Sequence, residues 1–340
     1  MSTALPTLLV GSYTATGGGT ATGISVVSAT PAESAASADV RTVAVIDDPS
    51  FLALAGDRVY AVSETADGGV SAFRRDGTEL LHLWDAPAGG DAPCHVRVDA
   101  SGTLVVTNYV SGTVTVLTLT DADEQAPSLV TELLPDASGP DADRQEGPHA
   151  HQSIATPDGT VLVADLGGDA LHEYRVTDAP SIEPVRVHHV APGVGPRHMA
   201  WYDGDLLVAG ELDGNVHRLR RDDAGSFRTV VRATTAPTDD AVDGSLLSHI
   251  EVDDRGLVYV AVRGRDQIVV LDAADGGLTL VGAAPSGGVW PRHFARVAGH
   301  VLVANQMSDA IAVLPIGADG VPGDAVAQIP VGTPTCIVPL

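Results

Sequence analysis

The sequence predicts an all-β protein, a seven-bladed β-propeller that forms a single domain over residues 1–340. A short sequence motif recurs seven times at spacings of 43 to 55 residues, and six of its seven copies contain a Pro. Such a period is typical of propeller blades. Each copy of the motif precedes an apolar strand, a tight turn and a second apolar strand. The two ends of the chain also read as parts of one blade. The motif is anchored at Pro49, Pro93, Pro148, Pro196, Ser248, Pro291 and Pro334.

The second strand of each repeat is a short apolar run. Turns such as Thr156–Gly159 and Asp253–Gly256 separate it from the first strand, and a Gly-, Asp- or Asn-rich turn leads to a third strand such as Gln267–Leu271. The fourth, outer strand is more variable. The second strands are expected at Val59–Ser63, Leu104–Thr107, Val161–Ala164, Leu206–Ala209, Val258–Val262 and Val301–Ala304.

The last blade is expected to contain both termini. Thr7–Ser12, Gly23–Val27 and Val43–Ile46 match the second, third and fourth strands of a repeat, and Thr335–Leu340 supplies the missing first strand. Closing the ring in this way removes the open sheet edges that a row of blades would expose.

Composition limits the class of partner. The chain has 44 acidic residues and 19 basic residues, all of them Arg, so its net charge is −25. Such a chain lacks the basic face that nucleic acids need, and its surface is expected to be acidic and solvated. No apolar run approaches the roughly 18 residues of a membrane span, and the N-terminus has no basic segment typical of a secretory signal, so we expect a cytoplasmic protein. Cys94 and Cys336, at equivalent places in the repeat, are expected to be free thiols.

Polar residues are expected to meet at one mouth of the central channel. In an antiparallel pair, the start of the first strand and the end of the second lie at the same end, and innermost strands line the channel. The long segments Asp121–Glu146 and Thr235–Ser245 precede first strands and should rim this mouth. The residues that open first strands are His95, His149, His151, Arg197, His198, His249, Arg292 and His293; those that close second strands are Tyr13, Glu64, Asn108, Asp165, Glu211, Arg263, Asn305 and Gln306.

This ring of side chains predicts a site for a small anionic ligand. Arg197, Arg263 and Arg292 gather in an acidic chain, and guanidinium forks fit carboxylates and phosphates. The arginines could instead form structural ion pairs with Glu211 or Glu64. The roles of four other residues could also be purely structural: His95 and His198 could hydrogen-bond the neighbouring backbone, and Asn108 and Asp165 could cap turns.

No cofactor or metal is expected. His149 and His151 flank Ala150 on one strand and should point the same way, but no third ligand has a diagnostic spacing. The sequence also contains no nucleophile elbow, P-loop or dinucleotide fingerprint.

Several motifs together resemble a known family, the seven-bladed propeller lactonases, which include bacterial 6-phosphogluconolactonases and fungal carboxymuconate-lactonising enzymes. They cover nearly the whole chain in family order. The matching segments are Gly147–Gln152 with Pro157–Gly159, Gly195–Met199, Gly210–Val216, Ser248–Ile250, Ala261–Arg263 and Trp290–Arg292.

The resemblance implies a metal-independent site made of a histidine, arginines and a glutamate. The catalytic residues would be His149, Arg197, Glu211 and Arg263, with His151 as an alternative to His149. The expected reaction is hydrolysis of a sugar lactone, most specifically 6-phosphogluconolactone. His149 or Glu211 would be the general base that activates water, and arginines would hold the oxyanion and the phosphate. Substrate contacts are expected from His95, His151, His198, His249, Arg292, Asn305 and Asp165.

Two other functions use the same fold. The same residues could serve a lactonising enzyme acting on an acidic, muconate-like substrate. The propeller could also be a non-catalytic interaction scaffold, although the 4% aromatic content offers few apolar anchors for a protein partner. We expect a small anionic lactone as substrate, no nucleic-acid or membrane partner, and a monomer or weak homodimer.

Overall fold

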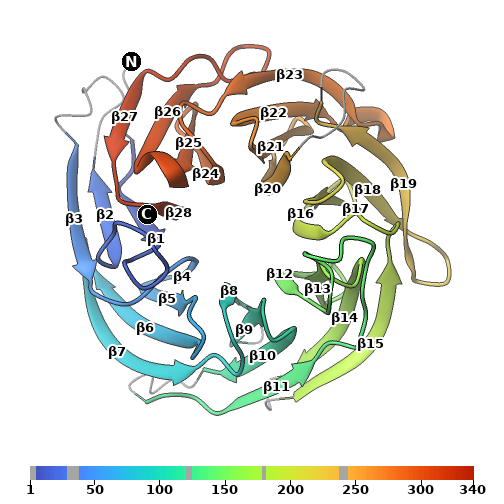
Figure 1. Cartoon of the computed structure of the whole chain (residues 1–340), viewed down its shortest axis with the longest axis horizontal. Helices are drawn as coiled ribbons and strands as arrows, with labels where there is room; N and C mark the ends of the chain where they lie inside the picture. The colour runs from blue at the N-terminus through green and yellow to red at the C-terminus, as the bar shows by residue number, and fades with distance from the viewer. Residues whose placement is uncertain (1–4, 29–37, 101, 120–124, 178–180, 237–243) are drawn as a thin grey trace.

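Seven antiparallel four-stranded sheets stand around a central channel, as Figure 1 shows, and they confirm the predicted all-β propeller. The computed structural model describes residues 5–28, 38–100, 102–119, 125–177, 181–236 and 244–340. Within these ranges the helical elements are two 3-10 turns, Ala274–Gly276 and Gln306–Ser308. None of the described helices is long and apolar enough to cross a membrane.

In each blade, four strands follow one another from the channel outward, in the order in which they pair. The inner strands are β4 (Leu52–Ala55), β8 (Pro93–Val98), β12 (Ala150–Ala155), β16 (Pro196–Tyr202), β20 (Leu246–Val252), β24 (Pro291–Val297) and β28 (Pro334–Pro339). The second strands are β5 (Arg58–Ser63), β9 (Thr103–Asn108), β13 (Val161–Asp165), β17 (Asp205–Gly210), β21 (Leu257–Arg263), β25 (His300–Asn305) and β1 (Leu8–Ser12).

The two peripheral strands complete every sheet. The third strands are β6 (Gly69–Asp76), β10 (Thr113–Thr118), β14 (Ala170–Thr177), β18 (Asn215–Arg221), β22 (Gln267–Asp272), β26 (Ala310–Pro315) and β2 (Ile24–Ser28). The outer strands are β7 (Glu79–Pro87), β11 (Leu129–Leu133), β15 (Ser181–His189), β19 (Phe227–Thr234), β23 (Thr279–Pro285), β27 (Ala327–Pro330) and β3 (Asp39–Ala44).

The closing blade contains both ends of the chain. Its order is β28-β1-β2-β3, and Figure 1 places the C-terminus beside β28 next to the blue N-terminal strands. The outer strand predicted at Val43–Ile46 is wrong in its bounds: β3 pairs Ala44 with Ile24 and runs back to Asp39, opposite Ser28. Val45 lies beyond this pairing and is 82% exposed.

The apolar core lies between neighbouring blades. Side chains alternate along a strand, so each face of a sheet meets a different neighbour. In β1, Leu8 and Val10 pack toward β25 and β26, in one cluster with Leu302, whereas Leu9 packs toward β4 and β5, in another cluster with Leu52. Burial on both faces explains why the second strands read as continuous apolar runs rather than as alternating patterns.

Replacing Ile337 of β28 with Ala should destabilise the protein by about 2–5 kcal/mol, because Ile337 is 2% exposed in the core beside β1. Leu133→Ala on β11, where the side chain is 63% exposed, should change stability by about 0.5 kcal/mol or less. Urea unfolding followed by tryptophan fluorescence measures both. Equal, small effects of the two variants would mean that the terminal strand does not hold the ring closed.

Candidate active site

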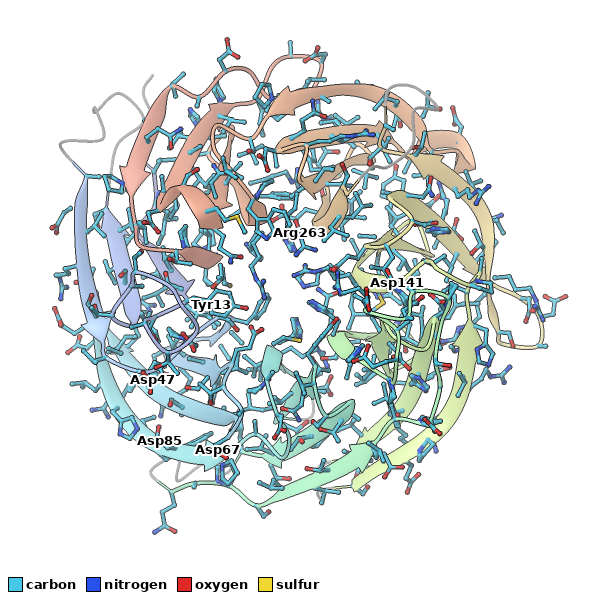
Figure 2. The ribbon with its side chains drawn as sticks, viewed as in Figure 1. Tyr13, Asp47, Asp67, Asp85, Asp141 and Arg263 are labelled. Carbon is cyan, nitrogen blue, oxygen red and sulfur yellow. The ribbon has the colours of Figure 1, made fainter. Side chains whose placement is uncertain are left out.

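A polar cavity of about 230 Å³ opens at one mouth of the channel. Its walls combine residues that open inner strands with residues that follow second strands, as the strand geometry predicts. Figure 2 shows Arg263, one of the lining residues, and Tyr13, which follows β1, at the edge of the channel. The residues around the cavity are Glu64, Cys94, Tyr109, Arg144, His151, Arg197, Glu211, Arg263 and Arg292.

A β-bulge near the start of the inner strand aims side chains into this mouth. In six blades the inner strand carries one more residue than its partner at this point, for example between Pro196, opposite Gly210, and Met199, opposite Val208. Such a bulge breaks the alternation of side chains and re-aims them. The first residues of the six bulges are Cys94, His151, Arg197, Ser248, Arg292 and Thr335.

The bulges correct the alignment of the repeats. Ala150, rather than Pro148, occupies the place of Pro196, so His151 is the counterpart of Arg197. The two cysteines are not equivalent, contrary to the prediction: Cys94 is a bulge residue, whereas Cys336 pairs with Gly11 as His95 pairs with Thr107. Both are buried free thiols. Burial raises the pKa of Cys94 to about 12, so the thiol in the cavity is a poor nucleophile at neutral pH.

Glu211 is the centre of a buried ion-pair network. Its Oε2 lies 2.9 Å from Nε of Arg197 and 2.8 Å from Nη2 of Arg263, and its Oε1 accepts a hydrogen bond of 2.5 Å from Nη2 of Arg144. Burial would raise the pKa of Glu211, but the three guanidiniums, Arg263 foremost, lower it to about 2. Burial, followed by repulsion from Arg263, lowers the pKa of Arg197 to about 9. All four groups are therefore charged at neutral pH.

A second charged group lies across the cavity. Nη2 of Arg292 is 3.5 Å from Oε2 of Glu64, and the hydroxyl of Tyr13 donates to Oε1 of Glu64 at 2.8 Å. The guanidinium also lies over the Tyr13 ring at 5.0 Å from its centroid. Burial raises the pKa of Tyr13 well above its usual value, so this hydroxyl stays protonated. Tyr13 and Glu64 thus fix the head of Arg292.

The two histidines of the Gly147–Gln152 segment have different surroundings. His149 stacks on Tyr109 with ring centroids 4.4 Å apart, and its Nδ1 bonds the Tyr109 carbonyl at 3.0 Å while Nε2 lies 3.3 Å from Glu146. His151 meets the edge of Tyr109 and lines the cavity. Among the described residues, its Nδ1 has no hydrogen-bond partner. Burial, followed by Arg197, lowers the pKa of His151 well below 6.5, so its imidazole is neutral at pH 7.

Residues 7–339 match a family described as Lactonase, 7-bladed beta-propeller. The chain belongs to this family. A 6-phosphogluconolactonase of Bacillus subtilis is 36% identical over 275 residues, which are 77% of this chain and 78% of the relative. The enzyme is accordingly a lactonase, a carboxylic-ester hydrolase, and the fold and family expected from the sequence are confirmed.

Solved structures agree over almost the whole chain. The crystal structure of a protein from Lactobacillus plantarum superposes with a TM-score of 0.88 at 28% identity and covers 99% of both chains. A periplasmic gluconolactonase of Pseudomonas aeruginosa superposes with a TM-score of 0.83 at 26% identity and covers 98% of both chains. The blades of the lactonase are thus arranged as in these relatives.

Below the cavity, imidazoles pack into a layer that fills the channel. His198 and His249 join through their Nδ1 atoms at 2.8 Å, and the rings of His249 and His293 stack at 3.9 Å. Phe51 packs against His95 at 4.5 Å. His95, His198 and His249, from which substrate contacts were predicted, are therefore not in the cavity lining. The structure places their side chains beneath it.

Asp165 and Asn305 lie outside the cavity. Oδ1 of Asp165 accepts hydrogen bonds from the backbone N–H groups of His149 and Gly168 at 2.8 and 2.9 Å. Asn305 donates to the carbonyl of Ser286 at 2.9 Å. Both side chains are fully buried and satisfied within their blades, so the turn-capping alternative describes them better than substrate binding.

Sequence reasoning missed Tyr109 and Arg144 as cavity residues. Tyr109 follows β9 as Glu211 follows β17, and both backbone N–H groups bond the residue before the inner strand, so the repeat contained a signal for it. Arg144 belongs to the irregular segment between β11 and β12, outside the strands whose repeat predicts the other cavity residues. In the part of the chain that the structure describes, no group of three or more His, Cys, Asp and Glu side chains is arranged to hold a metal.

The histidine layer should make stability depend on pH. Burial lowers the pKa values of His95 and His249 to about 3, and those of His151, His198 and His293 fall well below 6.5. Below pH 6.5 the unfolded chain binds protons that the folded chain excludes, so stability is complete above pH 6.5 and falls toward pH 3, by about 1.4 kcal/mol per pH unit for each histidine.

Urea unfolding at pH 7 and at pH 5 measures this slope. His95→Gln, which removes one titrating group from the layer, should make the slope shallower by about one proton. Equal stability at the two pH values, in wild type and variant alike, would contradict the neutral state of these imidazoles.

Proposed function

We propose that this lactonase hydrolyses 6-phosphogluconolactone to 6-phosphogluconate in the cytoplasm, as a monomer or weak homodimer. The observation that carries the proposal is the charge of the cavity. Four arginines and two glutamates line a space of about 230 Å³ in a chain of net charge −25. The excess of positive charge favours an anionic ligand, and the related 6-phosphogluconolactonase of Bacillus subtilis supports a phosphorylated one.

His151 is the proposed general base. It lines the cavity, and its imidazole is neutral at pH 7. Glu211 is less suited to this role, because both of its oxygens accept from guanidiniums and its pKa of about 2 makes it a weak base. His149 is bonded to Tyr109 and paired with Glu146, outside the cavity lining.

The proposed reaction begins with the attack of water on the lactone and ends with the release of a carboxylate. The imidazole of His151 takes a proton from a water molecule in the cavity as the water oxygen adds to the lactone carbonyl. The carbonyl oxygen becomes an oxyanion, and the ring C–O bond breaks when the tetrahedral intermediate collapses. The ring oxygen leaves as a hydroxyl by taking the proton from His151, and the new carboxyl group releases its own proton to solvent.

Arg197 and Arg263 are the proposed oxyanion partners. Glu211 holds each of them by one nitrogen, and their backbone contacts, Nη1 of Arg197 to the Ser248 carbonyl at 2.7 Å and Nη2 of Arg263 to the Leu247 carbonyl at 3.2 Å, fix their orientation. Donors held in place before the reaction stabilise developing charge without reorganisation. Glu211 thus serves catalysis by positioning two cations that would otherwise repel each other.

Purified enzyme should accelerate hydrolysis of freshly prepared 6-phosphogluconolactone beyond its spontaneous rate, and should act more slowly on glucono-lactone, which lacks the phosphate. A stopped assay of remaining lactone measures both. In ¹⁸O-water, hydrolysis places solvent oxygen in the product carboxylate, whereas a lactonising reaction does not. Failure to accelerate either lactone would overturn the assignment.

His151→Asn should lower kcat by about 10²–10⁴, the usual contribution of a positioned general base. His149→Asn is the matched comparison and should lose less, because His149 does not line the cavity. Steady-state kinetics with the folded variants, verified by circular dichroism, decide between them. The reverse order of losses would identify His149 as the base.

Arg197→Ala should abolish measurable lactone turnover while the fold survives, because it removes one oxyanion partner and leaves Glu211 with Arg144 and Arg263. Turnover and circular dichroism of the same preparation test this together. Turnover equal to that of wild type would remove Arg197 from the mechanism.

A further inference from the structure

Arg144 differs from the other cavity arginines in where it comes from. Arg197 and Arg292 are carried by inner strands and Arg263 by a second strand, whereas Arg144 lies in the segment between β11 and β12. Its side chain is 34% exposed, against 3% for Arg197 and 7% for Arg263. It therefore lies at the open mouth of the cavity, above the buried pair.

The segment that carries Arg144 is held firmly. Gln145 is fully buried and donates through Nε2 to the Leu166 carbonyl at 2.9 Å, while its Oε1 accepts from the Asp141 N–H at 3.2 Å. The backbone N–H of Gln145 bonds the Asp141 carbonyl at 2.7 Å. Figure 2 shows Asp141 over the inner strands, on the channel side of the blades. Arg144 is thus presented from a fixed base.

The guanidinium of Arg144 retains free donors. Nη2 makes both of its polar contacts, to Oε1 of Glu211 at 2.5 Å and to the hydroxyl of Tyr109 at 3.4 Å. Its Nε and Nη1 have no hydrogen-bond partner among the described residues. Arg197 and Arg263, in contrast, each bond a backbone carbonyl as well as Glu211.

The depth of the cavity separates the two ends of a substrate. His151 and Arg197 are 5% and 3% exposed, so the reacting carbonyl must lie deep, beside them. The far end of a six-carbon lactone then extends toward the mouth, where Arg144 and Tyr109 lie. Arg292 is engaged by Glu64 and the Tyr13 ring at the opposite wall.

We propose that Arg144 is a specificity-determining residue that selects lactones carrying a phosphate on the carbon farthest from the lactone carbonyl. The proposal rests on the proposed function for the position of the carbonyl. Arg144 binds the phosphate through its free Nε and Nη1 donors, and Gln145 positions it. The repeated strands supply the chemistry, whereas this segment between two blades supplies the choice of substrate.

Arg144→Gln tests the selection directly. It should lower kcat/KM for 6-phosphogluconolactone roughly ten- to hundredfold more than kcat/KM for glucono-lactone, mainly through KM. Arg144→Lys should fall between wild type and Arg144→Gln, because a lysine keeps the charge but loses the fork. Arg175→Gln removes an exposed arginine on β14, outside the cavity, and should leave both substrates unaffected.

A binding measurement separates this inference from the proposed function. Calorimetric titration with inorganic phosphate should show binding to wild type and to Arg175→Gln, and at least tenfold weaker binding to Arg144→Gln. If wild type hydrolyses neither lactone while phosphate binding still requires Arg144, the proposed function fails and the anion site stands. Equal losses on the two lactones, or phosphate binding unchanged in Arg144→Gln, would overturn the inference.

Discussion

Pairing of β28 with β1 closes the ring, and the active site exists only in the closed ring. The chain ends contribute one strand and three strands to the same sheet, so the seventh blade forms only when residues from both ends of the chain meet. That pairing brings Tyr13, at the end of β1, to Glu64 and Arg292, which are 228 residues apart in sequence. One wall of the cavity is therefore a direct product of closure, and any loss of the terminal strand would affect catalysis as well as stability.

Inside the closed ring, electrostatics are governed by one buried carboxylate. Three guanidiniums approach Glu211 within hydrogen-bond distance, in a site where burial penalises every charge. Without the carboxylate the arginines would repel one another, as the lowered pKa of Arg197 reflects. With it, the cavity keeps an excess of positive charge at fixed positions. The imidazoles of His151 and His198 remain neutral because burial, and after it the charge of Arg197, lowers their pKa values.

The sequence was sufficient for the blades, the closing pairing and the arginines of the strands, because all three follow from a repeat whose period and apolar runs can be read directly. It was insufficient where local geometry departs from the repeat. An inserted bulge residue shifts the alignment without altering the Pro-His motif, so His95, His198 and His249 appear as cavity residues although they lie one layer deeper. Arg144 was not predicted because it lies outside the strand repeat, where no aligned position marks a functional residue.

The difference between residues on strands and Arg144, on a segment between blades, has a physical cause. A residue on an inner strand is held by hydrogen bonds to the next strand and by contacts with the neighbouring blade, so changing it disturbs packing on two sides. A residue on a segment between blades is limited mainly by its own turn; here Gln145 and Asp141 fix the base of that turn while the guanidinium of Arg144 faces the mouth. Groups that the proposed reaction requires, such as His151 and Arg197, are thus best placed on strands. A group that distinguishes one lactone from another can change on the segment without loss of the fold, which is why specificity is expected there.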